Sequence, residues 1–292
     1  MLDSANHVEV VVRAGARLGE GPVWDTRSGR LVWVDVLASR VYLTDIDTGA
    51  SDEIETPLHA GAVAPRAAGG FVAALQDGFW VIGMGPPELI TRVPEARPDL
   101  RFNDGKCDPA GRFWAGTMAY DGARGAGALY RLGADGLAER ILDGVTISNG
   151  LAWSADGLTM YYVDSATQQI DTFSFAPSTG EISDRRCLVQ IPSEMGAPDG
   201  MTIDADGGLW VALWGGSAVH RYVDGRLDRV VQLPISMPTS CTFGGAELDE
   251  LYITSMSEGL SDEQRAAQPL AGAIFRLRPG VRGVPPAIFA GA

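Results

Sequence analysis

The sequence contains few residues of the types that bind soft metals or form covalent cross-links. Cysteine and histidine each occur three times in 292 residues, as Cys107, Cys187 and Cys241 and as His7, His59 and His220. The cysteines are odd in number, widely separated and include no CxxC pair, which argues against a disulfide framework. With so few histidines, a zinc site built from Cys and His is not expected.

Basic residues are outnumbered and scattered. Lys and Arg total 23 against 37 Asp and Glu, giving a formal net charge of −14. Because no basic stripe exists, the sequence predicts no nucleic-acid partner and no binding to an anionic membrane surface. No apolar run approaches the roughly 18 residues of a membrane span. The first seven residues lack the basic-then-apolar pattern of a signal peptide, so we expect a cytoplasmic protein.

Signatures of several enzyme classes are also missing. The chain has no G-x-S-x-G elbow and no serine that stands out as a nucleophile beside a histidine. It has no phosphate-binding loop of the G-x-x-x-x-G-K-[ST] type, and Gly125-Ala126-Gly127 is too short for a dinucleotide fingerprint. We expect Cys107 and Cys241 to be small buried fillers, because thiols are among the most buried side chains.

Glycine and proline are abundant, and their placement reveals a repeat. The 37 glycines and 17 prolines are dispersed at turn-like positions, as in an all-β chain with many tight reversals. A polar turn followed by two hydrophobic strands and a hairpin recurs about every 40 to 50 residues, the spacing of four-stranded propeller blades. Six such units begin near residues 29, 69, 111, 156, 207 and 248.

This repeat predicts an all-β, six-bladed β-propeller with four-stranded blades, formed by residues 1–292 as a single domain. The segment 7–12, HVEVVV, reads as a strand that joins the last blade and closes the ring, which removes exposed sheet edges. A β-sandwich or two small barrels are the alternatives. Residues 261–267 are expected to form a short helical turn, and Trp33, Trp114, Trp153 and Trp210 to pack between blades.

Four short motifs place an oxygen-bearing side chain beside glycine or proline. They are Glu20-Gly21-Pro22, Arg101-Phe102-Asn103-Asp104-Gly105, Ser148-Asn149-Gly150 and Pro198-Asp199-Gly200. Asn-Gly and Asp-Gly are common turn dipeptides, so each motif alone is best interpreted as an ordinary turn. Each motif, however, precedes the first predicted strand of a blade. Equivalent positions in a ring face one axis, so we expect the four to converge.

Converging carboxylate and amide oxygens would form a pocket for a hard divalent cation. Glu20 and Asp199 supply two charges, and Asn103 and Asn149 supply neutral carbonyl oxygens. These four side chains would not fill the coordination shell of a cation. A substrate oxygen could therefore take an open coordination position, where the cation could polarise a carbonyl. Trp214, beside Gly215-Gly216, is a candidate for the pocket wall.

At these motifs the chain resembles the SMP-30/gluconolactonase family of six-bladed propellers, the regucalcin-like lactonases. The stretches RFNDGKCDPAGRFWAGTM and ISNGLAWSADGLTMYYVDS carry the resemblance, which extends over essentially the whole chain. It implies Glu20, Asn149 and Asp199 as metal ligands. It also implies that Arg101 contacts substrate and that Asn103 contacts substrate and, in some members, the metal.

One position departs from the family pattern. Where animal members carry a glutamate shortly after the GTM segment, this chain has Tyr120. A tyrosine can still hydrogen-bond sugar hydroxyls, so Tyr120 is a predicted substrate contact, but its larger ring would reshape the pocket.

The resemblance implies metal-dependent hydrolysis of a sugar lactone to the aldonic acid. Asp199 is the predicted general base, Arg101 and Asn103 would orient the substrate, and the partner is a small five- or six-carbon lactone. The cofactor is one divalent metal ion, with Ca²⁺ preferred and Mg²⁺, Mn²⁺ or Zn²⁺ as alternatives. Residues 122–127 form either a mobile lid or an ordinary hairpin. Two other functions stay open: a phosphotriester or organophosphate hydrolase, and a non-catalytic calcium-binding propeller.

Overall fold

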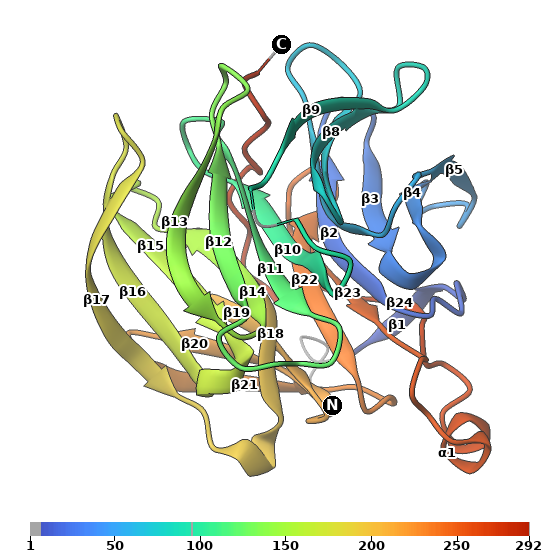
Figure 1. Ribbon diagram of the computed structural model, residues 1–292. Helices are drawn as coiled ribbons and strands as arrows, with labels where there is room; N and C mark the ends of the chain where they lie inside the picture. Colours follow the sequence, from blue (N-terminus) through green and yellow to red (C-terminus); the bar gives the residue numbers. More distant parts are fainter. Residues whose placement is uncertain (1–6, 95, 292) are drawn as a thin grey trace.

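The computed structural model describes residues 7–94 and 96–291 of the chain and is built almost entirely of β-strands. Six four-stranded antiparallel sheets surround a common axis, as Figure 1 shows. The predicted six-bladed β-propeller is therefore confirmed. The prediction that residues 1–292 form one domain includes residues 1–6, 95 and 292, which lie outside the described part, and it stays a prediction.

Within each of the first three blades, consecutive strands are hydrogen-bonded neighbours. Blade 1 consists of β2 (Gly19–Asp25), β3 (Arg30–Asp35), β4 (Arg40–Thr44) and β5 (Ser51–Glu55). Blade 2 consists of β6 (Ala60–Pro65), β7 (Phe71–Leu75), β8 (Gly78–Ile82) and β9 (Glu88–Arg92). Blade 3 consists of β10 (Leu100–Cys107), β11 (Phe113–Ala119), β12 (Gly127–Leu132) and β13 (Ala138–Val145).

The last three blades follow the same order, and the sixth is completed by the N-terminal strand. Blade 4 consists of β14 (Ser148–Trp153), β15 (Thr159–Asp164), β16 (Gln169–Ala176) and β17 (Glu181–Gln190). Blade 5 consists of β18 (Ala197–Ile203), β19 (Leu209–Trp214), β20 (Ala218–Val223) and β21 (Arg226–Gln232). Blade 6 consists of β22 (Pro238–Gly244), β23 (Glu250–Ser255), β24 (Ile274–Leu277) and, outermost, β1 (Glu9–Val12). The predicted ring closure is confirmed, because β1 pairs antiparallel with β24.

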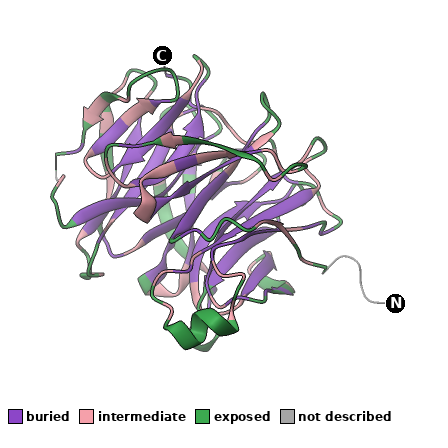
Figure 2. Ribbon diagram, turned by 90° about the vertical axis from the view of Figure 1, so that its right-hand side faces the viewer, coloured by how far each residue is buried: buried purple, intermediate pink, exposed green. Residues whose placement is uncertain are grey.

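The hydrophobic core lies between neighbouring blades, so both faces of most strands are buried (Figure 2). One cluster joins blades 2 and 3 through Phe79, Phe102 and Phe113. The four tryptophans expected to pack between blades are all buried. Three of them are also fixed at their polar end, because Nε1 donates from Trp33 to Thr44 Oγ1 over 2.9 Å, from Trp114 to Asp108 Oδ2 over 2.9 Å and from Trp210 to Asp204 Oδ2 over 2.8 Å.

The innermost strand of every blade contains a β-bulge near its start. Register shifts fall between Glu20 and Val23, Ala60 and Ala62, Phe102 and Asp104, Ser148 and Leu151, Pro198 and Met201, and Pro238 and Ser240. A bulge leaves its extra residue without a partner in the ladder and redirects its side chain.

These bulges correct the sequence interpretation of the four motifs. The motifs were expected in turns that precede the first strand of each blade, but they lie inside β2, β10, β14 and β18. The segments interpreted as first strands are the second strands of their blades. The error has a physical cause: a bulge, like a turn, interrupts regular pairing and is often built with glycine, so the local composition is the same.

Two features mark opposite ends of the ring. The helix α1 (Asp262–Ala267) begins after Ser261 with a complete capping box, which confirms the predicted helical turn. The C-terminal segment lies at the end opposite to α1 in Figure 1. There Gly283 pairs with Asp204 of blade 5, and Phe289 pairs with Arg66 of blade 2, so residues 283–289 cross the axis. No helix in the described residues is long and apolar enough to span a membrane.

Candidate functional site

The oxygen-bearing side chains of the four motifs come from four innermost strands and are all buried. Glu20 lies on β2, Asn103 on β10, Asn149 on β14 and Asp199 on β18, each at or beside a bulge. Their exposed fractions are 3%, 5%, 3% and 7%. Innermost strands of successive blades contact one another around the axis, which brings these residues to one end of the central channel.

Hydrogen bonds connect three of the predicted site residues directly. Arg101 Nη1 donates to Asn103 Oδ1 over 2.6 Å, and Asn103 Nδ2 donates to Asn149 Oδ1 over 2.9 Å. Asn149 Nδ2 then donates to Ser165 Oγ over 2.8 Å, and Ser165 Oγ donates to the carbonyl oxygen of Pro198 over 2.6 Å. The network therefore runs from blade 3 through blade 4 to the residue that precedes Asp199.

Two buried aspartates fix the backbone that leads into Glu20 and Asn149. Asp35 Oδ1 accepts from the amide of Leu18 over 3.1 Å, just before β2. Asp164 Oδ1 accepts from the amide of Ile147 over 2.9 Å, just before β14. A carboxylate that accepts hydrogen bonds from backbone amides holds the chain rigidly. Each of these aspartates therefore helps to fix the bulge in the first strand of its own blade.

The two acidic residues of the site share an environment that opposes their ionisation. Burial raises the pKa of Glu20 well above its ordinary value, and the charges of Asp199 and Asp104 raise it further. Burial likewise raises the pKa of Asp199 well above its ordinary value, and the charge of Asp104 adds to this. Oδ1 of Asp199 is buried and has no hydrogen-bond partner among the residues that the structure describes.

These observations fit a divalent cation. A buried carboxylate oxygen without a partner is costly, and a cation beside it would remove both that cost and the repulsion from neighbouring carboxylates. Carboxylate and amide oxygens are the donors that hard cations prefer. Over the described ranges, no group of three or more His, Cys, Asp or Glu is placed to hold a metal ion, so amide oxygens would have to complete the set. Asn149 Oδ1 accepts one hydrogen bond and keeps a second lone pair for this purpose.

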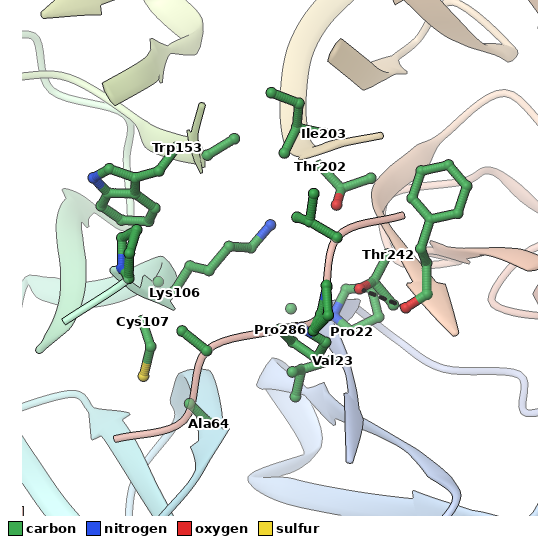
Figure 3. A pocket seen from close by; sticks show the side chains of 18 of the residues that line it. Pro22, Val23, Ala64, Lys106, Cys107, Trp153, Thr202, Ile203, Thr242 and Pro286 are labelled. Carbon is green, nitrogen blue, oxygen red and sulfur yellow. Dashed lines mark hydrogen bonds between the residues drawn. The ribbon is translucent and has the colours of Figure 1, made fainter. Parts of the chain in front are cut away.

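A third carboxylate and a lysine lie on the same channel and were not singled out in the sequence. Asp104 follows Asn103 and is buried, and Lys106 points into a cavity of about 320 Å³ (Figure 3). Lys106 Nζ donates to the carbonyl oxygen of Met201 across the channel over 2.6 Å. Burial lowers the pKa of Lys106, whereas the charge of Asp104 favours its ammonium form. Both residues lie in the sequence RFNDGK beside Arg101 and Asn103, and this position could have indicated that they are near the site.

The cavity extends from the bulges toward the carboxyl ends of the innermost strands. Its lining includes Gly21, Asp104 and Ser240 beside the candidate site and Trp153, Ile203 and Phe243 farther along these strands. Residues 284–287 of the C-terminal segment line it as well. Substrate access is therefore expected at the other end of the channel, where Tyr120 lies.

Tyr120 follows β11 and forms part of the rim at the site end of the channel. Its side chain is half-exposed, and the Arg101 guanidinium carbon lies 5.9 Å from the centre of its ring. Its hydroxyl is 2.6 Å from Nδ1 of His59, a residue that sequence reasoning left without a role. Trp214, at the end of β19, is also half-exposed and donates from Nε1 to the sulfur of Met256 over 3.1 Å.

The segment 122–127 connects β11 to β12 at the same end as Tyr120. One hydrogen bond ties it to the site end of the neighbouring blade, from the amide of Gly125 to Oγ1 of Thr146 over 3.1 Å. Whether the segment acts as a lid stays a prediction.

Comparison with known proteins gives the chain a family. The model of the SMP-30/Gluconolactonase/LRE-like region matches residues 18–257. Regucalcin of Xenopus laevis is 39% identical over 299 residues, covering 99% of this chain and 100% of the relative. A Bacillus subtilis protein named "Putative sugar lactone lactonase YvrE" is 37% identical over 290 residues, covering 97% and 99% of the two chains.

A solved structure agrees with these relatives. The calcium-binding protein regucalcin from Agrobacterium tumefaciens superposes with a TM-score of 0.92 at 28% identity, covering 96% of each chain. The family match spans all four motifs, and the relatives are similar along nearly their whole length. The chain therefore belongs to the SMP-30/gluconolactonase/LRE-like family.

Proposed function

We propose that this protein hydrolyses a sugar lactone to the corresponding aldonic acid with the help of one divalent cation. The observation that carries the proposal is the unpartnered, buried Oδ1 of Asp199. It lies with Glu20 and the hydrogen-bonded amides of Asn103 and Asn149 at one end of the channel. The family description and the lactonase name of one relative support lactone hydrolysis over other hydrolytic reactions.

Glu20, Asn149 and Asp199 are the proposed metal ligands, and Ca²⁺ is the preferred ion. Oxygen donors favour Ca²⁺ or Mg²⁺ over soft metals, and one solved relative is named as calcium-binding. When bound, such an ion supplies Lewis-acid polarisation of a carbonyl oxygen.

The remaining chemistry belongs to the side chains of the chain. Water attack forms a C–O bond at the lactone carbonyl carbon, the ring C–O bond breaks, and the ring oxygen becomes a hydroxyl. Asp199 is the proposed general base, which holds the proton lost by water and returns it to the ring oxygen. Burial raises the pKa of Asp199 in the metal-free protein, and a bound cation would favour its ionised form, the form that accepts a proton.

Arg101 and Asn103 are the proposed substrate-orienting residues. Among the described residues, the Arg101 side chain makes hydrogen bonds only from Nη1, to Phe102 O over 3.0 Å and to Asn103 Oδ1. The guanidinium carbon lies 5.9 Å from the centre of the Tyr120 ring, and its other N–H groups are proposed to donate to substrate oxygens. Tyr120 is proposed to contact a substrate hydroxyl. A cytoplasmic location stays a prediction from the sequence.

The experiment is a pH-stat assay of the purified protein against a panel of aldonolactones and a phosphorofluoridate, each with and without EDTA. We expect acid release from at least one aldonolactone, and its loss on chelation. Turnover of the phosphorofluoridate alone would favour a phosphotriesterase. A cation-dependent rise in thermal stability without turnover of either class would favour a non-catalytic calcium-binding propeller.

A further inference from the structure

We propose that His59 is a positioning residue for substrate: it holds the Tyr120 hydroxyl at the rim of the channel, where that hydroxyl recognises a ring hydroxyl of the lactone. This inference rests on the proposed function and names a residue that positions its substrate. Nothing in the sequence pattern or in the family match assigns a role to His59.

The two side chains come from neighbouring blades and meet at the site end of the channel. His59 precedes β6 of blade 2, and Tyr120 follows β11 of blade 3. Nδ1 of His59 lies 2.6 Å from the Tyr120 hydroxyl, and the two rings meet edge to face with centroids 5.7 Å apart. The contact therefore fixes both the position of the hydroxyl and the direction of the tyrosine ring.

Backbone hydrogen bonds hold both residues at this place. The carbonyl oxygen of His59 accepts from the amide of Gln76, over 3.0 Å. The amide of Tyr120 donates to the carbonyl oxygen of Asp99, again over 3.0 Å. Because Tyr120 is anchored through its backbone and its hydroxyl, a half-exposed side chain is held in one orientation before substrate arrives, which reduces the entropy lost on binding.

Arg101 links the His59–Tyr120 pair to the candidate site. The Arg101 guanidinium lies against the Tyr120 ring, and its Nη1 donates to Asn103 Oδ1. Arg101 is buried and belongs to the hydrogen-bonded network of the site. A substrate hydroxyl that reaches Tyr120 is thus placed beside the free edge of a guanidinium, and this suits a polyhydroxylated ring.

The hydrogen-bonding capacity of the pair fits a hydroxyl ligand. Burial lowers the pKa of His59, and the nearby cations Arg101 and Arg17 lower it further, which favours the neutral form of the ring. A neutral imidazole uses Nδ1 either as donor or as acceptor. In both cases the tyrosine hydroxyl retains further hydrogen-bonding capacity, and a sugar hydroxyl, which donates and accepts, can complement either arrangement.

The experiment is a double-mutant cycle on the metal-loaded protein with glucono-1,5-lactone. His59→Ala and Tyr120→Phe each remove the hydrogen bond, and each should raise KM about 3- to 10-fold while kcat stays within about twofold. The double variant should be no worse than Tyr120→Phe alone, because both changes remove the same interaction. His59→Gln, which can still hydrogen-bond the phenol, should recover part of the loss.

A binding measurement and a matched control accompany the kinetics. Calorimetric titration with the unreactive gluconolactam should show the same loss of affinity in His59→Ala. The chain contains a second His–Tyr pair, His220 Nδ1 with the Tyr222 hydroxyl at 3.0 Å, buried in blade 5. Tyr222→Phe removes a hydroxyl from that pair and should leave KM unchanged.

If the increases in KM of His59→Ala and Tyr120→Phe multiply in the double variant, the positioning role is overturned. A fall in kcat with KM unchanged would also overturn it. Absence of lactone turnover by the wild-type protein would overturn the proposed function and this inference with it. If wild type turns over the lactone and His59→Ala has the same KM and kcat, this inference is overturned and the proposed function stands.

Discussion

Asn103 Nδ2 donates to Asn149 Oδ1 over 2.9 Å, and this bond joins the bulges of two adjacent blades. The same amide group donates to the carbonyl oxygen of Ser148 over 2.8 Å. Because both asparagines are buried, their amides are fixed in orientation before any cation or substrate binds. The inner ring thus pre-organises these two amides for the proposed site.

Removal of the Asn103 side chain should destabilise the fold. Asn103→Ala leaves two buried carbonyl oxygens without their donor, and the free energy of unfolding should fall by about 1 to 3 kcal/mol. Urea denaturation of the metal-free protein measures the change. An unchanged denaturation midpoint would contradict the view that this amide joins blades 3 and 4.

Asp199→Asn should abolish most lactone turnover and leave a folded protein. The amide keeps the shape but can neither accept the proton of water nor contribute a charge to the cation, so kcat should fall by about 10²-fold or more. The pH-stat assay measures turnover, and circular dichroism reports the fold. Asp206→Asn, in the exposed turn after β18, is the matched control and should leave kcat unchanged. Full activity of Asp199→Asn would remove this residue from the mechanism.

Metal removal should lower both activity and stability. A ligand present at 100 times its dissociation constant stabilises the native state by about 2.7 kcal/mol. Adding Ca²⁺ to the EDTA-treated protein should therefore raise Tm in a concentration-dependent way and restore turnover. Glu20→Gln, which removes one proposed ligand charge, should weaken this rise in Tm. An equal response in the variant would exclude Glu20 as a ligand.

The buried His220 should make the protein less stable as the pH falls. Burial lowers the pKa of His220, so the unfolded chain takes up a proton near the ordinary histidine pKa while the native state resists it. The stabilisation is present above the ordinary pKa and is lost as pH decreases below it. The difference in Tm between wild type and His220→Gln should thus be larger at pH 8 than at pH 5. A constant difference would indicate that His220 titrates normally.

The three thiols should differ in reactivity. Cys107 and Cys241 are buried and Cys187 is exposed. Burial raises the pKa of Cys107 well above its ordinary value and that of Cys241 to about 12. A disulfide reagent at pH 8 should modify one thiol in the native protein and three after denaturation, because thiolates react and thiols do not. Replacing Cys187 with Ser should abolish the native reaction.

Much of the fold could be predicted from the sequence because strand periodicity and glycine placement are local. The repeat of about 40 to 50 residues predicted six blades, and the strand β1 was recognised as the closing element. The roles of Glu20, Asn149 and Asp199 as ligands, of Asp199 as base, and of Arg101, Asn103 and Tyr120 as substrate contacts stay predictions. Their convergence followed from the symmetry of a ring, in which equivalent positions face one axis.

The sequence by itself determined the propeller and which oxygen-bearing side chains belong to its inner ring, since both depend on a repeat along the chain. Tertiary structure alone decided that the motifs are bulges within the innermost strands, because a bulge and a turn have the same composition. It also decided which partners come from other blades, such as the Met201 carbonyl oxygen that accepts from Lys106 and the His59 ring that contacts the Tyr120 hydroxyl. Such contacts join residues far apart in sequence, and no local pattern encodes them.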